Sequence, residues 1–150
     1  MDAKPIGFLL VDDNDDDIRI VQEALADVKL IDIVGVVRNG EEALAYLRRE
    51  HNYKDAHAPD LILLDINMPK KNGFEVLLEI KAEPILRHIP VIMYTTSQRH
   101  EDILQAYMAG ACSYISKPAD FRELKEVMLN LERYWTRVSR LPGRFHNQLP

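Results

Sequence analysis

The sequence predicts an α/β fold: a doubly wound, five-stranded parallel sheet with helices on both faces, in a single domain. Two patterns lead to this prediction. Short aliphatic runs alternate five times with longer segments whose apolar residues recur every three or four positions. One of these runs, Leu61 to Leu64, is aliphatic throughout, which is typical of a parallel strand buried on both faces. Such alternation implies parallel strands joined by right-handed helical crossovers, and 150 residues fit one domain.

The first half of the chain predicts two strands, each followed by a helix. The first strand is Ile6 to Val11, and the helix after it has an apolar face formed by Ile18, Val21, Leu25 and Val28. Three carboxylates stand at the start of this helix, where we expect them to cap free amides and to meet the positive end of the helix dipole: Asp15, Asp16 and Asp17. Ile31 to Val37 predicts the second strand, and Glu41 to Arg49 predicts the second helix.

The second half predicts three more strands and three more helices, after a polar loop from His51 to Pro59. The strands are Leu61 to Leu64, Val91 to Tyr94 and Cys112 to Ser116. The helices are Gly73 to Ala82, Arg99 to Met108, and a last one from Asp120 into the 130s. This last helix has an unusually long apolar stripe: Phe121, Leu124, Met128, Leu131, Trp135 and Val138. The tail from Leu141 to Pro150 contains two prolines and one glycine, and we expect it to be loose or to lie on the surface.

Composition limits the possible classes of function. A net charge of −5 gives no broad basic surface for nucleic acid. No apolar run reaches the roughly 18 residues that cross a bilayer, so we expect no membrane partner. The single cysteine, Cys112, excludes an internal disulfide and indicates a reducing compartment, which we take to be the cytoplasm. We expect the Cys112 side chain to be a small buried group.

Polar side chains follow all five predicted strands, although the second is followed only by Arg38 and Asn39. Asp12 and Asp13 come after the first strand, Asp65 after the third, Thr95 after the fourth and Lys117 after the fifth. In an open parallel sheet these positions share the edge where ligands bind, so we expect the five side chains to lie close together.

Three crowded carboxylates raise one another's pKa unless a cation lies among them. Mg²⁺ prefers oxygen ligands and keeps several waters. Asp13, Asp65 and a backbone carbonyl near Asn67 could therefore bind this ion, with Asp12 acting through water. A lysine and a hydroxyl opposite them would suit phosphoryl oxygens, and an aspartate carboxylate can itself be a nucleophile.

Four motifs give this arrangement a family resemblance: LLVDDN (9–14), LLDINMPKKNG (63–73), MYTT (93–96) and YISKP (114–118). Their order, and the spacings of 30 residues from Asp65 to Thr95 and 22 from Thr95 to Lys117, resemble those of response-regulator receiver domains, the CheY-like family. The resemblance covers about residues 5 to 135. It implies a flavodoxin-like sheet with strand order 2-1-3-4-5.

The resemblance also implies a function. Asp65 would be the phosphoacceptor, receiving a phosphoryl group from a sensor histidine kinase. Asp12, Asp13 and the Asn67 carbonyl would hold Mg²⁺ beside it. Such a domain catalyses only its own phosphorylation and dephosphorylation, and is not otherwise an enzyme.

Four further roles follow from the resemblance. Thr95 would be the switch hydroxyl, and Tyr114 the aromatic residue that turns inward when Thr95 moves. Lys117 would contact the phosphoryl oxygens. The peptide bond before Pro118 would be cis, as is common in the family.

The long loop and the sequence NLERYWTRVSRLPG (130–143) resemble single-domain response regulators that partner phytochrome-type histidine kinases. We therefore expect a phytochrome-type kinase as partner. The residues after Val138 are too few for a helix-turn-helix, so we expect no nucleic-acid partner and an output through protein contacts. We expect a homodimer with Tyr134 and Trp135 near its edge, although Trp135 could equally pack on its own domain.

Two other functions stay open for a fold of this kind. A flavodoxin-like module that binds a nucleotide or flavin without phosphorylation would need a glycine-rich phosphate loop, whereas residues 12–15 are acidic or polar. An aspartate-dependent phosphatase would need a cap domain, for which the chain has little room. Asp12 and Asp13, taken alone, could also be no more than helix caps.

Overall fold

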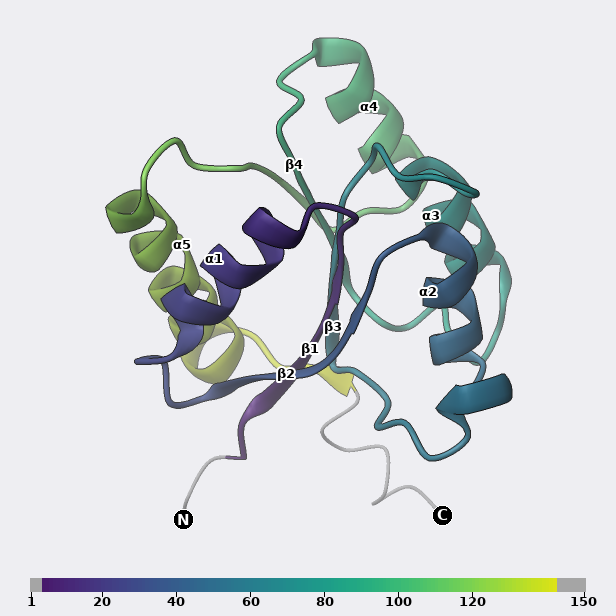
Figure 1. Cartoon of the computed structure of the whole chain (residues 1–150), viewed down its shortest axis with the longest axis horizontal. Coiled ribbons are helices and arrows are strands. Elements are labelled where there is room, and N and C mark those ends of the chain that lie inside the picture. The colour runs from purple at the N-terminus through teal and green to yellow at the C-terminus, as the bar shows by residue number, and fades with distance from the viewer. Residues whose placement is uncertain (1–3, 143–150) are drawn as a thin grey trace.

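Five parallel strands form one sheet between two layers of helices (Figure 1). The structure is a computed structural model and describes residues 4–142. The strand order is β2-β1-β3-β4-β5, as predicted. The strands are β1 (Ile6–Val11), β2 (Ile31–Val37), β3 (Leu61–Leu64), β4 (Val91–Thr95) and β5 (Ser113–Ser116). The helices are α1 (Asp15–Leu25), α2 (Gly40–Leu47), α3 (Gly73–Ala82), α4 (His100–Met108) and α5 (Phe121–Arg133), with shorter turns η1 (His51–Tyr53) and η2 (Tyr134–Val138).

The strand side chains alternate between two separate hydrophobic cores. Leu9 and Val11 of β1 point into the core covered by α2, α3 and α4, whereas Phe8 and Leu10 point into the core covered by α1 and α5. β1, β3 and β4 are buried along their whole length, and the two edge strands are only partly covered. A strand that faces two cores needs apolar residues on both sides, which explains the aliphatic runs in the sequence.

Asparagine or aspartate side chains cap four of the helices. The Asn14 side chain accepts a hydrogen bond from the Asp17 amide, so Asn14 caps α1 and the prediction that the three following carboxylates cap it was wrong. Those carboxylates lie in the first turn, where they still meet the positive end of the dipole. Asn39 and Asp120 cap α2 and α5, and Asn72 forms a capping box with Glu75 at the start of α3.

The end of the chain departs from the predicted long helix. α5 ends at Arg133 and is followed by one π-helical turn, η2, in which the Ser139 amide donates to the Tyr134 carbonyl at 2.7 Å. The predicted apolar stripe is buried only in its middle, at Leu124 and Met128, whereas Phe121 and Val138 are exposed. A helix beside a five-stranded sheet can cover only the sheet below it, so the ends of the stripe have nothing to pack on.

Leu141 was predicted to lie in a loose or surface tail, but its side chain is fully buried in the core under α1 and α5. The rest of the predicted tail, residues 143–150, lies outside the described residues. Trp135 is partly buried and packs against the same core. The chain after α5 therefore folds back and closes this core.

The prediction of a buried Cys112 was wrong, whereas the segment after α2 is a loop as predicted. Cys112 is exposed, because it precedes the partly covered edge strand β5 instead of belonging to it. The loop after α2 contains the short turn η1, whose Tyr53 ring lies 5.3 Å from the ring of Tyr46. Within residues 4–142, no helix is long and apolar enough to cross a membrane.

Candidate functional site

The carboxyl ends of the strands are held together by hydrogen bonds that continue the sheet one residue further. The Asp65 amide donates to the Val11 carbonyl at 3.0 Å, and the Lys117 amide donates to the Thr95 carbonyl at 2.7 Å. Because these bonds fix the backbone, the side chains of Asp65 and Lys117 start from rigid positions at one edge of the sheet.

Three polar side chains are buried among the described residues, and all three were predicted to belong to the site. Asp12 is 1% exposed, Asp65 is 7% exposed and Thr95 is 0% exposed. Burying a carboxylate costs free energy unless it is paired or hydrogen-bonded. Among the described residues, the buried polar side chains therefore all belong to the predicted site.

Lys117 joins the site into one ionic cluster. Its Nζ lies 2.7 Å from Asp12 Oδ2, 2.9 Å from Asp17 Oδ2 and 3.0 Å from Asp65 Oδ2. An ammonium has three hydrogens to donate, so each hydrogen has one carboxylate acceptor. Lys117 is the cation of this group, and Asp13 adds a fourth carboxylate beside Asp12 and Asp65.

Burial and pairing shift the pKa values in this cluster. Burial raises the pKa of the Asp12 carboxyl, although hydrogen bonds from Lys117 and the Asn14 amide lower it in part. Burial alone would lower the pKa of Lys117, but its hydrogen bonds to Asp12 and Asp17 and its attraction to Asp65 raise the pKa above the usual value. Lys117 therefore stays charged at neutral pH. Burial also raises the pKa of Tyr94, whose ring centre lies 5.6 Å from Lys117 Nζ, to about 12.

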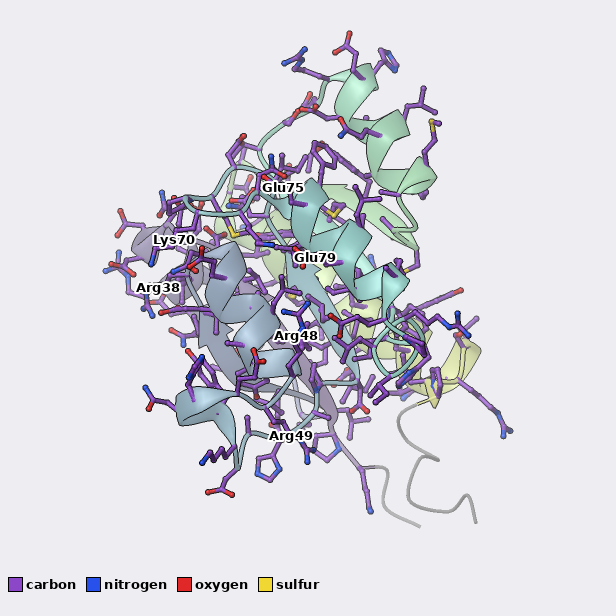
Figure 2. The ribbon with its side chains drawn as sticks, turned by 90° about the vertical axis from the view of Figure 1, so that its right-hand side faces the viewer. Arg38, Arg48, Arg49, Lys70, Glu75 and Glu79 are labelled. Atoms are coloured by element: carbon purple, nitrogen blue, oxygen red, sulfur yellow. The ribbon has the colours of Figure 1, made fainter. Side chains whose placement is uncertain are left out.

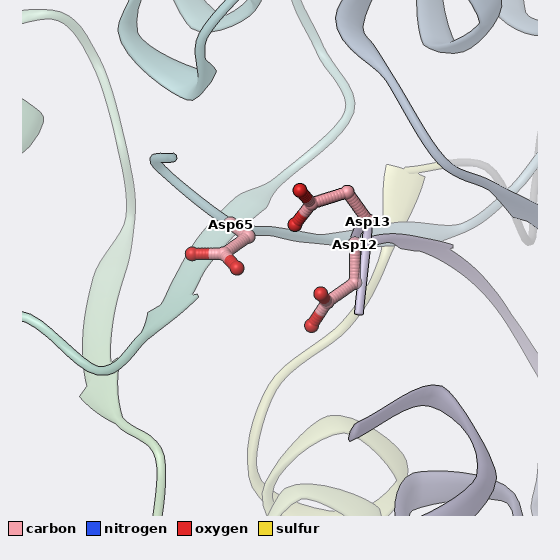
Figure 3. A group of neighbouring side chains, drawn as sticks. All are labelled: Asp12, Asp13 and Asp65. Atoms are coloured by element: carbon pink, nitrogen blue, oxygen red, sulfur yellow. The ribbon is translucent and has the colours of Figure 1, made fainter. Parts of the chain in front are cut away.

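The carboxylates of Asp12, Asp13 and Asp65 lie next to one another at the ends of β1 and β3 (Figure 3). One oxygen of each lies within 4.8 Å of the others. Asp13 is exposed while the other two are buried, so an ion could enter from the Asp13 side. Three hard oxygen donors at this spacing fit Mg²⁺. Asn67 is exposed two residues after Asp65, and its carbonyl stays a predicted ligand.

A glycine lets helix α3 begin directly against the backbone of Asp65. A Cβ atom on Gly73 would lie 2.2 Å from the Asp65 carbonyl oxygen, which is closer than any real contact. The Gly73 amide instead donates to the Ile66 carbonyl at 2.7 Å. The glycine that ends the LLDINMPKKNG motif is therefore required by packing around Asp65.

Thr95 is the last residue of β4, and Tyr114 of the neighbouring strand β5 contacts the loop that follows β4. The Thr95 hydroxyl is buried and has no hydrogen-bond partner within the described part of the chain. The Tyr114 hydroxyl donates to the Ser97 carbonyl at 3.0 Å, and Ser97 Oγ donates to Asp102 Oδ2 of α4 at 2.5 Å. The loop is thus fixed to β5 and α4, while the buried hydroxyl beside it is unsatisfied.

The expected cis bond before Pro118 is not present, since no peptide bond among residues 4–142 is cis. A trans bond before proline is favoured by about 0.5–1 kcal/mol unless the surroundings select the cis form.

A hollow of about 660 Å³ lies at the opposite end of the sheet from the acidic cluster, between the end of α2 and the segment before β4. Arg48 on its wall extends across to α3, where its Nη2 lies 3.3 Å from Glu79 (Figure 2). Arg48 also pairs with Glu83. This hollow shares no residue with the acidic cluster and contains none of the predicted site residues.

Comparison with known proteins agrees with this geometry. Residues 8–129 match the model of the response regulator receiver domain. The chain belongs to the response regulator receiver family. As a receiver domain, it is 37% identical to the response regulator Rcp1 of Synechocystis sp. over 139 residues, which are 93% of this chain and 95% of Rcp1. It is 36% identical to FilR2, a probable methanogenesis regulatory protein of Methanothrix harundinacea, over 93% of this chain and 89% of FilR2.

Two solved structures that resemble this chain are of response regulators. The phosphorylated cyanobacterial phytochrome response regulator RcpA superposes with a TM-score of 0.85 at 45% identity, over 92% of this chain and 99% of RcpA. The Mn²⁺-bound form of Rcp1 superposes with a TM-score of 0.81 at 38% identity, again over 92% and 99%. The predicted likeness to phytochrome-associated response regulators is confirmed.

Sequence reasoning missed the part that Asp17 plays in this receiver. Asp17 was assigned to helix capping with its two neighbours, yet its carboxylate contacts Lys117. The signal was its position on the helix: Asp17 lies one turn before Val21, on the stripe that α1 turns toward the core.

Replacing Lys117 by methionine should lower the free energy of unfolding by about 3–5 kcal/mol at neutral pH, because two buried carboxylates lose their counter-ion. Without the ammonium, burial raises the pKa of the Asp12 carboxyl further, because the hydrogen bond from Lys117 no longer lowers it. The loss should therefore shrink as pH falls from about 7 to about 5 and protons neutralise this carboxyl. Urea unfolding of both proteins at each pH measures this difference. Lys125→Met is the control, because Lys125 pairs with Asp27 on the surface, and an equal loss there would contradict the prediction.

Replacing Thr95 by valine should raise the free energy of unfolding by about 1 kcal/mol, because it removes a buried hydroxyl that has no partner and keeps the side-chain shape. Urea unfolding at neutral pH tests this. Thr96→Val is the control, since Thr96 is exposed and its replacement should change stability by less than about 0.5 kcal/mol. A loss of stability in Thr95→Val would mean that the hydroxyl has a partner in solution.

Proposed function

We propose that this receiver is a phosphorelay response regulator that accepts a phosphoryl group on Asp65 from a histidine kinase. One observation carries the proposal: Asp65 is a buried carboxylate that contacts the Lys117 ammonium, and its oxygens lie close to those of Asp12 and Asp13. This arrangement provides a nucleophile, a fixed positive charge and a place for a divalent cation within one cluster.

The hydrogen bonds of Asp65 orient it for attack. Oδ1 accepts from the Ile66 amide at 2.7 Å, and Oδ2 accepts from Lys117 at 3.0 Å. In the transfer, a bond forms between an Asp65 carboxylate oxygen and phosphorus. The phosphorus–nitrogen bond to the histidine of the kinase breaks, and its electron pair stays with the imidazole. Lys117 then faces the negative phosphoryl oxygens.

Asp12, Asp13 and Asp65, with the Asn67 carbonyl, would hold Mg²⁺. When bound, this ion neutralises the charge that develops on the phosphoryl oxygens. The oxygen-only donor set and the solvent-accessible Asp13 support this part of the proposal. The related Rcp1 has a Mn²⁺-bound form.

Thr95 and Tyr114 would transmit the change. A phosphoryl oxygen on Asp65 would give the unsatisfied Thr95 hydroxyl an acceptor, so Thr95 would turn toward Asp65. The space near Thr95 would then admit the Tyr114 ring, which now lies half-buried with its hydroxyl on the Ser97 carbonyl. The loop and α4 would move with it, which biases a two-state surface.

The relatives support the proposed kinase partner. Similarity to phytochrome response regulators supports a phytochrome-type kinase as the donor. An output through protein contacts, without nucleic acid or membrane, and a cytoplasmic location are parts of the same proposal. The acidic loop after β1 disfavours a flavodoxin-like module that binds an anionic cofactor.

Incubation with acetyl phosphate and Mg²⁺ should add one phosphoryl group, which intact-mass spectrometry detects. Asp65→Asn should abolish the addition, because an amide is not a nucleophile here. Asp13→Asn should slow it about tenfold or more through weaker Mg²⁺ binding. Asp60→Asn is the matched control, since Asp60 sits before the same strand but bonds to the Gly7 amide at the other end of the sheet. Phosphorylation that persists in Asp65→Asn would overturn the proposal, and EDTA should prevent it in the wild type.

The homodimer would use the face formed by α4, β5 and α5. α4, α5 and the turn η2 expose several large apolar side chains, namely Leu104, Tyr107, Met108, Leu129, Tyr134 and Val138. Exposed apolar groups gathered on one face are typical of protein interfaces. Of the two predicted edge residues, Tyr134 is 47% exposed and available, whereas Trp135 packs on its own core.

Sedimentation at micromolar concentration should show a dimer for the wild type and a monomer for Met108→Asp, because a charge at this 79% exposed position would be buried unpaired in the interface. Ile85→Asp, at an 82% exposed position near the start of β4, is the control and should stay dimeric. A monomeric wild type would remove the dimer from the proposal.

A further inference from the structure

Lys117 is held by one carboxylate that belongs neither to the metal cluster nor to the phosphoacceptor. Asp17 Oδ2 lies 2.9 Å from Lys117 Nζ. The carboxylates close enough to share a cation are Asp12, Asp13 and Asp65, and Asp17 is not among them. The proposed phosphotransfer therefore gives Asp17 no task, although it contacts the central cation.

The other two partners of Lys117 change their roles in the proposed function, on which this inference rests. Asp12 would turn to the metal, and the Asp65 carboxylate would become an acyl phosphate. Two of the three hydrogen bonds of the ammonium would then be replaced or weakened, while the bond to Asp17 would stay. We infer that Asp17 is a positioning residue, which keeps Lys117 aimed at the phosphoryl group on Asp65.

The backbone around Asp17 is fixed for this task. The Asn14 amide donates to Asp12 Oδ1 at 2.9 Å, and the Asp17 amide donates to Asn14 Oδ1 at 3.0 Å. These two bonds link the metal-site loop to the first turn of α1, so the Asp17 Cα has a set place relative to Asp12. The Asp17 side chain takes no part in this capping, and its removal leaves the cap in place.

The two neighbouring carboxylates differ from Asp17. Asp15 pairs with Arg38 at 2.9 Å and Asp16 pairs with Arg19 at 3.0 Å, and both pairs lie on the open surface. The Asp17 side chain is only one-third exposed, and its partner Lys117 is 8% exposed. Asp16 therefore provides a matched control, with the same charge in the same helical turn but no contact with Lys117.

Two possible roles of Asp17, positioning Lys117 or only adding negative charge, predict opposite changes in the binding of phosphoryl mimics when Asp17 is removed. If Asp17 only added negative charge, its removal would make the site less repulsive to an anion, and phosphoryl mimics would bind more tightly. If Asp17 anchors Lys117, its removal frees a flexible side chain with four rotatable bonds, and phosphoryl mimics would bind more weakly. The sign of the change therefore identifies the role.

The test is the binding of beryllium fluoride, a phosphoryl mimic, measured by isothermal titration calorimetry at saturating Mg²⁺. We expect Asp17→Ala to weaken binding about tenfold, the scale of one charge-assisted hydrogen bond. Asp17→Asn keeps an acceptor oxygen and should lose less, about threefold. Asp16→Ala and Asp16→Asn should stay within about twofold of the wild type. Thermal unfolding of each variant verifies the fold, and Asp17→Asn alone carries the test if the alanine variant does not fold.

Each outcome distinguishes this inference from the proposed function. Weaker binding in the Asp17 variants, with normal binding in the Asp16 variants, supports the positioning role. Unchanged or tighter binding in the Asp17 variants overturns it and leaves the proposed function intact. Absence of binding to the wild type, or binding that persists in Asp65→Asn, overturns the proposed function and this inference together.

Discussion

The ion cluster around Lys117 is the interaction on which the site depends. Asp12 and Asp65 are buried, and two carboxylates at this spacing repel one another without a cation. Lys117 comes from the far side of the sheet, at the end of β5, and meets carboxylates from the ends of β1 and β3 and from α1. One ammonium thus ties four elements together, and its charge offsets part of the repulsion among the carboxylates.

The sheet makes this cluster possible because parallel strands bring residues distant in sequence to one edge. Asp12 and Lys117 are 105 positions apart, yet their side chains touch. The strands that carry them are buried in two cores, so the backbone at the edge has little freedom. The candidate site is therefore formed by the few side chains that follow the strands. In open α/β sheets, ligands generally bind at the carboxyl ends of the strands.

Much of this could be predicted from the sequence. Aliphatic runs and helical periods predicted the sheet and its helices, because burial on two faces imposes those patterns directly, and the motif spacing placed Asp12, Asp65, Thr95 and Lys117 at one edge. The parts that could not be predicted depend on contacts across the fold. Asp17 resembles a capping residue until α1 is placed beside Lys117, and Leu141 resembles a tail residue until the chain folds back onto the core.

The burial of Leu141 has a consequence for how this protein is made. A chain emerges from the ribosome from its N-terminus, and a domain folds as its parts become available. The core under α1 and α5 includes Leu141, which comes well after the last strand. This core therefore stays open on the nascent chain after every strand of the sheet has been synthesised. The opposite core, complete by Tyr114, can form first, so the two faces of one sheet mature at different times during translation.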